Sequence, residues 1–372
     1  MSVYEKLGLK RAINGVGTVT NLGGSLMPRE VVDAMREASE AFVDMRELIR
    51  RTGAIVAELT GAEAGIITSG ASAGLVLATA ACMTGNDPEK MERLPDTRGM
   101  RNEIIVQRTL RTGWYRMLQL TGARLVEAGD VDETTAGQVE EAVTARTAAI
   151  WYFDFEPREG IVSLEELAKI GKRRGVPVLV DAAAEVPPVE NLTRYLQRGA
   201  DVVVFSGGKG IRGPNDSGFV CGRRDIVEAI ALQMCPRMGI GRAMKIGKEG
   251  IIGAISALTR YVREDHAMEA RDWEDKVTYM VKELGRIPGL RAERVIPEAD
   301  MPIRPLGIPR TQVTLDEEAL DCSAEELVAE LADGNPSIRL YAWRGRVLIN
   351  PQCLQDGEER VIVAQIRSVL ME

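Results

Sequence analysis

Short apolar runs alternate with longer amphipathic stretches along the first 250 residues of the chain. Runs of this kind are typical of strands buried on both faces, and the stretches between them have helical spacing. The alternation predicts an α/β fold, with a mostly parallel sheet covered by helices on both faces. The expected strands are 66–68, 103–107, 123–127, 148–153, 176–181, 201–205 and 218–221, and the expected helices are 30–59 with an interruption, 112–121, 163–174 and 191–197.

A different pattern begins near residue 250. Apolar residues at helical spacing run from 248 to 285, and Gly285 and Pro288 end the run, which predicts one long helix leaving the large domain. Strands expected at 290–295, 311–315 and 337–349, the last turning at Arg344, then mix with helices at 324–332 and 358–370 in a small α+β domain. We expect an N-terminal segment 1–29 near a dimer interface, a large cofactor domain 30–250, and a linking helix with the small domain over 251–372.

Composition and charge narrow the function classes. The chain has 372 residues, 45% of them hydrophobic, so it can bury a large core. Its net charge of −8 argues against nucleic-acid binding, which requires a surplus of clustered Lys and Arg. The N-terminus has no apolar signal core, and the charge-free stretch 64–84 fits a buried strand and helix better than a membrane span, so we expect a cytoplasmic protein. Five cysteines without a C-x-x-C pair and one histidine predict no metal site.

Two charged residues follow neighbouring strand candidates. Lys209 lies in the glycine loop after strand 201–205, where a buried amine can form a Schiff base with an aldehyde cofactor. Asp181 ends strand 176–181, where a carboxylate can pair with a protonated pyridine nitrogen. Together they indicate pyridoxal 5'-phosphate as the cofactor.

A phosphate site is expected at the turn Ser69-Gly70-Ala71-Ser72, between strand 66–68 and an alanine-rich helix. Free N–H groups at a helix N-terminus bind anions, and Ser206 can add a hydroxyl. An anion turn, then a strand ending in Asp, then a strand ending in Ser-Gly-Gly-Lys is the order in fold-type I pyridoxal phosphate enzymes, the aspartate aminotransferase-like group.

Competing phosphate motifs fail on spacing. A Walker loop ending at Lys209 requires glycine where Val203 stands, and Gly210 occupies its Ser/Thr position. Segments 15–20 and 239–244 begin like dinucleotide fingerprints but lack the third glycine. ATP and nicotinamide chemistry are therefore disfavoured.

Several segments together resemble the family of bacterial selenocysteine synthase, the seryl-tRNA selenium transferase, and most closely its D-glucosaminate-6-phosphate ammonia-lyase branch. The segments are 13–24, 69–74, 162–167, 178–181, 206–209 with Gly213-Pro214, and 241–249. The resemblance implies that Lys209 is the Schiff-base lysine, that Asp181 partners the pyridine nitrogen, and that Ser206 and the 69–72 turn hold the phosphate.

The resemblance also implies that Arg242 and Lys245 match basic residues that face the active site in the tRNA-dependent enzymes. Two cations three apart on one helical face can bind a substrate carboxylate or phosphate, and the alternative is a solvated helix start. Arg339 and Arg344 are further candidates for the substrate carboxylate, with exposed hairpin arginines as the alternative. Arg108 and Arg111 follow a strand where a residue that covers the cofactor ring is often found.

Departures from the tRNA-dependent enzymes favour a small-molecule substrate. Gly24 replaces a basic residue of those enzymes, whereas 20–25 reads like the ammonia-lyase pattern, and the chain is too short to add a tRNA-binding region. We expect a homodimer or higher homo-oligomer that eliminates a hydroxy-amino acid, such as a phosphorylated amino sugar acid, to ammonia and a 2-oxo acid. A racemase or aminotransferase is the alternative within the same chemistry. A non-catalytic partner in tRNA-linked selenium metabolism is the alternative of another class.

Overall fold

The computed structural model describes residues 2–110, 112–153, 158–298 and 304–371, which form two compact units. Residues 27–264 make the large unit, and residues 1–26 together with 265–372 make the small one. The expected boundary at residue 250 therefore lies fourteen residues too early, because α11 (Lys248–Arg263) packs against the first helices of the large unit. The N-terminal segment belongs to the small unit and is not a separate part.

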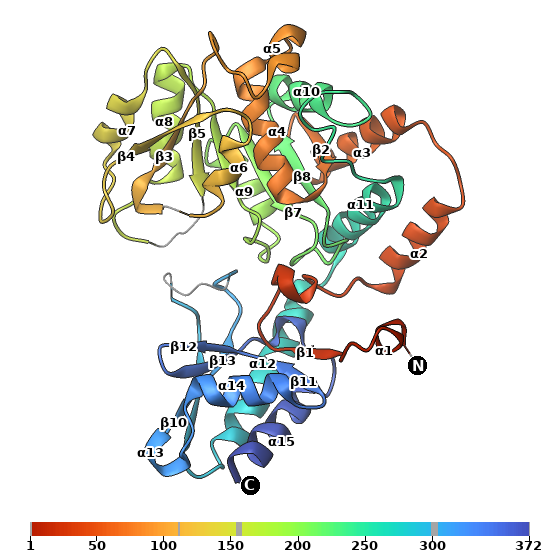
Figure 1. The fold of residues 1–372 in the computed structure, drawn as a ribbon, viewed down its shortest axis with the longest axis vertical. Coiled ribbons are helices and arrows are strands. Elements are labelled where there is room, and N and C mark those ends of the chain that lie inside the picture. The colour runs from red at the N-terminus through yellow and green to blue at the C-terminus, as the bar shows by residue number, and fades with distance from the viewer. Residues whose placement is uncertain (1, 111, 154–157, 299–303, 372) are drawn as a thin grey trace. The chain divides into compact units, whose positions relative to one another are not determined.

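A seven-stranded sheet forms the centre of the large unit, as the apolar runs predicted (Figure 1). Its strand order is β2-β8-β7-β6-β5-β3-β4; β8 runs antiparallel to β2 and β7, and the other neighbouring pairs are parallel. The strands are β2 (Ala64–Thr68), β3 (Glu103–Gln107), β4 (Arg124–Ala128), β5 (Thr147–Phe153), β6 (Val178–Asp181), β7 (Val202–Ser206) and β8 (Gly218–Gly222).

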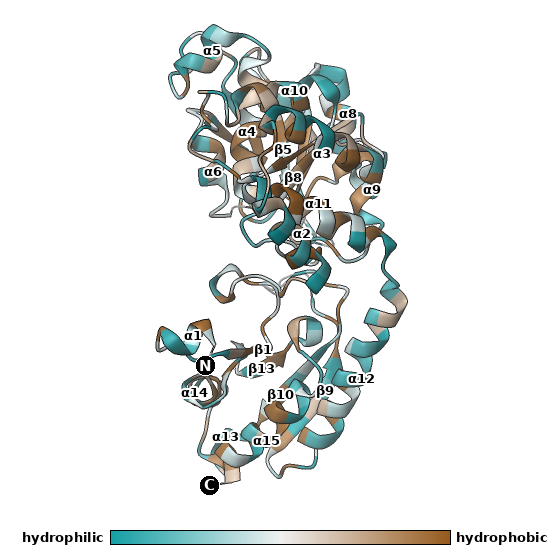
Figure 2. Ribbon diagram, turned by 90° about the vertical axis from the view of Figure 1, so that its right-hand side faces the viewer, coloured by the Kyte–Doolittle hydropathy of each residue, from teal (hydrophilic) through white to brown (hydrophobic). Residues whose placement is uncertain are grey.

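Both faces of this sheet are buried because successive residues of each strand enter opposite hydrophobic clusters. Val203 packs in one cluster, whereas its neighbours Val202 and Val204 pack in the other. Figure 2 shows β5 and β8 as apolar ribbons between more polar helices. The helices are α2 (Arg29–Ser39), α3 (Met45–Thr60), α4 (Gly70–Thr84), α5 (Pro88–Arg93), α6 (Tyr115–Gln119), α7 (Ala136–Ala142), α8 (Leu164–Arg174), α9 (Asn191–Gln197), α10 (Arg224–Gln233) and α11.

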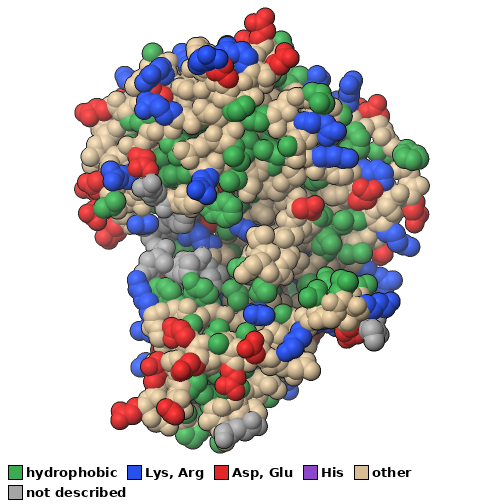
Figure 3. Space-filling view, in the orientation of Figure 1, with side chains coloured by type: hydrophobic (Ala, Val, Ile, Leu, Met, Phe, Trp, Pro, Cys, Tyr) green, Lys and Arg blue, Asp and Glu red, His purple; other side chains and the backbone are tan. Residues whose placement is uncertain are grey.

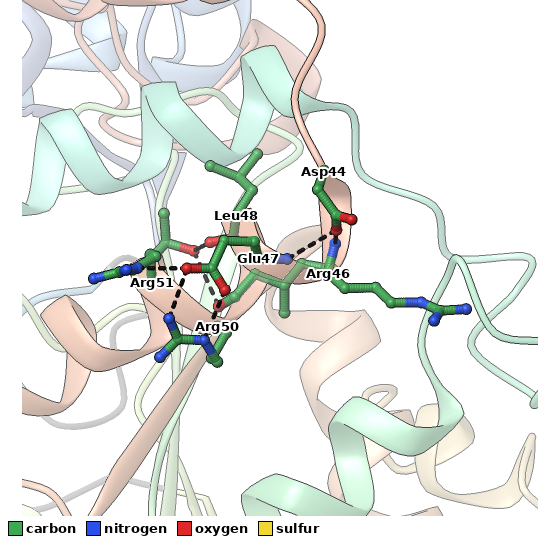
Figure 4. A network of polar contacts seen from close by, with 8 residues as sticks. Asp44, Arg46, Glu47, Leu48, Arg50 and Arg51 are labelled. Atoms are coloured by element: carbon green, nitrogen blue, oxygen red, sulfur yellow. Dashed lines mark hydrogen bonds and ion pairs between the residues drawn. The ribbon is translucent and has the colours of Figure 1, made fainter.

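The interruption expected within 30–59 lies between α2 and α3. Asp44 caps α3 by accepting hydrogen bonds from the N–H groups of Arg46 and Glu47, at 2.8 and 3.1 Å (Figure 4). The Glu47 carboxylate contacts the guanidinium groups of Arg50 and Arg51, which lower its pKa to about 2. These local contacts fix where the second helix begins.

The small unit contains two sheets, one of which joins distant parts of the chain. β1 (Ala12–Asn14) pairs in parallel with β11 (Ser337–Arg339), so Ile13 lies opposite Ile338. A four-stranded sheet has the order β12-β13-β10-β9. Its strands are β9 (Leu290–Val295), β10 (Arg310–Leu315), β12 (Tyr341–Trp343) and β13 (Arg346–Ile349), and the unit's helices are α1 (Val3–Lys6), α12 (His266–Leu284), α13 (Glu317–Leu320), α14 (Ala324–Asp333) and α15 (Glu358–Met371).

The single long helix expected over 248–285 is wrong. The chain forms α11 and α12 instead, because Asp265 turns out of the helix and accepts hydrogen bonds from the N–H groups of Ala267 and Met268, at 3.1 and 3.2 Å. The break separates the two units, since α11 packs in one and α12 in the other.

Gly53 lies where α3 packs on β2, so its substitution tests how close this contact is. A methyl group there would overlap the carbonyl oxygen of Gly65, so we expect Gly53→Ala to lower the free energy of unfolding by about 1–3 kcal/mol. Gly137 of α7 is the matched control, because a methyl group there meets nothing within 4 Å. Gly137→Ala should instead add about 0.4–1 kcal/mol. Urea unfolding of both variants measures the difference, and equal effects would contradict the close helix–sheet contact.

Charged side chains of both signs are scattered over the face of the molecule seen in Figure 3. Among the helices of the described residues, none combines the length and the apolar character needed to cross a membrane.

Candidate active site

Asp181 and Lys209 are placed at one edge of the large sheet by two adjacent parallel strands. Asp181 is the last residue of β6 and is aligned with Val204 of β7. β7 ends at Ser206, and Lys209 follows three residues later. Because the carboxyl ends of parallel strands meet at the same edge, the acid and the amine come together as the sequence predicted.

Burial shifts both groups toward their neutral forms. The pKa of the Asp181 carboxyl is raised by burial, against which the Ala183 N–H, 3.0 Å from Oδ1, and the charge of Lys209 act. The pKa of the Lys209 amine is lowered by burial, while the carboxylates of Asp181 and Glu185 oppose the shift. At a given pH, a lysine whose pKa is lowered has a larger neutral fraction than a solvated lysine, and the neutral amine is the nucleophile.

The glycines around Lys209 are required by close backbone packing. A Cβ at Gly207 would overlap the Ser217 hydroxyl, and a Cβ at Gly208 would overlap the Asn215 backbone. The loop closes on itself, because the N–H of Gly213 donates to the Gly207 carbonyl at 2.8 Å. The lysine therefore projects from a compact and internally bonded loop.

The expected phosphate turn joins β2 to α4. Most of α4 is buried, but Ser69, Gly70, Ala71 and Ser72 at its start remain half-exposed. The first N–H groups of a helix have no partner within it, so an exposed first turn on a buried helix can accept an anion. The Ser69 hydroxyl donates to the Met244 carbonyl at 2.9 Å, so its proton is already used within the protein.

Gly218 of β8 brings the phosphate turn and the lysine loop together. It pairs with Thr68 of β2 on one side and with Ser206 of β7 on the other. A Cβ at Gly218 would lie 2.6 Å from the carbonyl carbon of Gly70, so only glycine allows β8 to contact the start of α4. Ser206 is itself only 8% exposed. The anion turn, the lysine loop and Asp181 thus share one sheet edge.

Arg242 and Lys245 are both exposed, but the shared helical face expected for them is wrong. They lie in turns and irregular backbone before α11, which begins only at Lys248. The segment is nevertheless tied to the phosphate turn, because Met244, next to Lys245, accepts the hydrogen bond of Ser69.

The other arginine candidates lie elsewhere. Arg339 ends β11 in the small unit and is exposed, and the Arg344 guanidinium lies 4.4 Å from the centre of the Trp343 ring. In the large unit, Arg108 pairs with Glu127 at 3.8 Å. Arg111 lies outside the described residues. Arg108 and Arg344 thus have partners unrelated to Asp181.

Sequence reasoning missed Glu185, in the turn after β6. This carboxylate is 7% exposed, and its charge acts on Lys209. The signal was present as one acidic residue within the otherwise apolar run 182–188. Arg310 was also missed; it is 1% exposed and donates to the Ile308 carbonyl at 2.8 Å, which makes it a structural residue of the small unit.

These residues fit pyridoxal phosphate. The partly buried Lys209 amine can bond to its aldehyde carbon, the Asp181 carboxyl can pair with its ring nitrogen, and the half-exposed first turn of α4 can bind its phosphate. The fit rests on the partial burial of the acid–amine pair at the sheet edge and on the half-exposed start of α4, since a fully solvated lysine and a fully buried helix would support neither contact.

Comparison with known proteins matches residues 12–284 to the family model of L-seryl-tRNA selenium transferase. The chain is 35% identical to the 5'-C-glycyluridine monooxygenase-decarboxylase of a Streptomyces species over 381 residues, covering 99% of this chain and 92% of that protein. It is 33% identical to the D-glucosaminate-6-phosphate ammonia lyase of Salmonella typhimurium over 379 residues, covering 99% and 98%.

The solved structures agree with the sequence relatives. A structure of D-glucosaminate-6-phosphate ammonia-lyase matches with a TM-score of 0.87 and 32% identity, covering 100% of this chain and 98% of that one. Serine palmitoyltransferase of Sphingomonas wittichii matches at 14% identity with a TM-score of 0.59, a likeness of fold alone. The chain therefore belongs to the L-seryl-tRNA selenium transferase family and has the fold of the fold-type I pyridoxal phosphate enzymes.

Proposed function

We propose that the chain is a pyridoxal phosphate-dependent ammonia-lyase. Its substrate is a 2-amino acid with a β-hydroxyl and a second anionic group, such as a phosphorylated amino sugar acid. The observation that supports this best is the partly buried Lys209–Asp181 pair at one sheet edge, in a chain that matches the ammonia lyase along 99% of its length. The sequence resemblance to the ammonia-lyase branch at Thr20-Asn-Leu-Gly-Gly-Ser25, with Gly24 in place of a basic residue of the tRNA-dependent enzymes, also supports the proposal.

Each residue has a defined part in this reaction. When bound, the cofactor supplies an electron sink for the bond broken at the substrate α-carbon. The Lys209 amine takes the α-proton and then passes it to the departing β-hydroxyl, which leaves as water. Asp181 holds a proton on the ring nitrogen throughout. The resulting enamine takes up water and gives ammonia and a 2-oxo acid.

Arg242 and Lys245 are proposed to bind the second anionic group. Both are exposed, and Met244 between them is hydrogen-bonded to Ser69 of the phosphate turn, which supports a position near the cofactor site. Charged hydrogen bonds to a phosphate are strong enough to favour phosphorylated over plain substrates. Arg339 is retained as the candidate for the substrate carboxylate.

The experiment is a substrate screen that separates the competing reactions at the α-carbon. Phosphorylated and plain hydroxy-amino acids are incubated with cofactor-loaded protein and scored for ammonia, 2-oxo acid, α-deuterium exchange, CO₂ and oxygen uptake. Equal amounts of ammonia and 2-oxo acid without oxygen uptake support the lyase. Inversion with deuterium exchange but no ammonia makes the protein a racemase, and oxo acid formed only with an amino acceptor makes it an aminotransferase. CO₂ release with oxygen uptake would place it with the monooxygenase-decarboxylase relative, which is 35% identical to this chain against 33% for the lyase.

We further propose a cytoplasmic homodimer or higher homo-oligomer with the 14–25 segment near a cofactor. Fully exposed Phe42 and half-exposed Val43, between α2 and α3, support a subunit interface, because isolated monomers seldom leave adjacent large apolar residues in water. Sedimentation velocity tests this assembly, and a fully active monomer would rule it out.

A further inference from the structure

Glu185 lies in a turn whose backbone is held on both sides. Its N–H donates to the Ala182 carbonyl at 3.2 Å, and its own carbonyl accepts from Nδ2 of Asn191 at 2.6 Å. Asn191, at the start of α9, is 6% exposed. The turn is therefore anchored between the end of β6 and α9, and the buried carboxylate has a defined position.

The same turn packs directly on the lysine loop. A Cβ at Gly210, next to Lys209, would overlap the carbonyl oxygen of Val186, next to Glu185. Only glycine therefore fits at position 210, where the two loops touch. Within the described residues, the charged groups that act on the Lys209 amine are Asp181 at the end of β6 and Glu185 in this turn. Arg212, in the lysine's own loop, contacts its backbone through an N–H to the Lys209 carbonyl at 3.0 Å.

Glu185 is only 7% exposed, and a carboxylate in such a low-dielectric setting acts on nearby charges more strongly than it would in water. Asp181 has a separate task in the proposed function, because its charge is committed to the ring nitrogen. The lysine ammonium formed after the α-proton has moved then needs another counter-charge. Glu185 is the second carboxylate within electrostatic reach of that amine.

We propose that Glu185 is a positioning residue for Lys209, whose carboxylate stabilises the lysine ammonium between removal of the α-proton and its delivery to the leaving hydroxyl. This inference rests on the proposed function. One proton moves from the α-carbon to the amine and from the amine to the hydroxyl oxygen, and Glu185 stays ionised throughout.

The first test measures the protonation of Lys209 without substrate. The cofactor-free full-length chain is treated with cyanate across a pH series, and carbamylation of Lys209 is followed by peptide mass spectrometry. Only the neutral amine reacts. Removing a nearby negative charge disfavours the ammonium, so Glu185→Gln should move the midpoint of reactivity to lower pH by about one unit, a tenfold change in the equilibrium. Glu190→Gln, which neutralises an exposed carboxylate five residues away, should leave the midpoint in place.

The second test uses the cofactor-loaded enzyme. The acidic limb of the kcat/KM profile should move to lower pH in Glu185→Gln, kcat should fall, and KM should stay near the wild-type value. Glu185→Asp keeps the charge, so the midpoint of Lys209 reactivity should stay at the wild-type value. This variant is measured in place of the glutamine variant if that one does not fold. An unchanged Lys209 midpoint in the folded glutamine variant, or a displaced one in the aspartate variant, overturns the proposal. Because cyanate reactivity needs no substrate, a shifted midpoint together with a negative ammonia screen would reject the proposed function alone.

Discussion

Lys209→Ala is expected to lower kcat by about 10²–10⁴-fold, the usual range for loss of a positioned proton-transfer group. The amine is partly buried at the sheet edge beside Asp181, and the proposed reaction uses it both as the bond to the cofactor and as the proton carrier. Borohydride reduction of the loaded wild-type protein followed by peptide mapping should place the cofactor label on Lys209. Loss of this label and of turnover in the same variant would link the two roles.

Lys172→Ala is the matched control, since Lys172 is an exposed lysine in the last turn of α8. It should keep both the label and the activity. Lys248 is a poor competitor for the label, because its ammonium already contacts Glu249 and donates to the Ala38 carbonyl at 2.5 Å. A label found on Lys245 or Lys248 would refute the site assignment.

Asp181→Asn should leave the cofactor bound but lower kcat by about 10²–10³-fold, the scale found when one preorganised electrostatic partner is removed. The amide keeps the size of the side chain but cannot hold a proton on the ring nitrogen. Absorbance of the purified variant measures cofactor content, and steady-state kinetics measure turnover. A drop in kcat without loss of bound cofactor separates this electrostatic role from a role in binding.

Asp216→Asn is the control for this substitution. Asp216 is an exposed carboxylate at the end of the lysine loop, and no role is assigned to it. Its replacement should leave turnover within about twofold, as expected for surface substitutions. Near-normal turnover in Asp181→Asn would reduce Asp181 to a structural carboxylate that bonds to the Ala183 N–H.

The large sheet was predictable because its strands are buried on both faces and therefore read as apolar runs. The same reading gave the positions of Asp181 and Lys209, since each directly follows such a run and parallel strands align their ends. The local pattern of apolar residues was enough to locate these strands, because burial on both faces of the sheet determines which residues they contain.

Features that depend on distant partners were not predictable. The periodicity of 248–285 continues across the break, and the local helix cap at Asp265 does not by itself show that α11 and α12 pack in separate units. Arg242 and Lys245 have helical spacing in a segment that is not helical. Glu185 acts on a lysine 24 residues away because their two loops touch at Val186 and Gly210, a contact that no local pattern records.

The pairing of β1 with β11 has a consequence for synthesis of the protein. Ile13 leaves the ribosome early but meets Ile338 only after more than three hundred further residues have been made. The large unit, residues 27–264, can fold during this interval, because domains fold as units while the chain grows. Residues 12–14 must wait as an unpaired strand, and closing so long a loop is slow compared with local folding. The nascent chain therefore carries an exposed strand edge until residues 337–339 have been made, and this is the stage at which chaperone binding would protect it best.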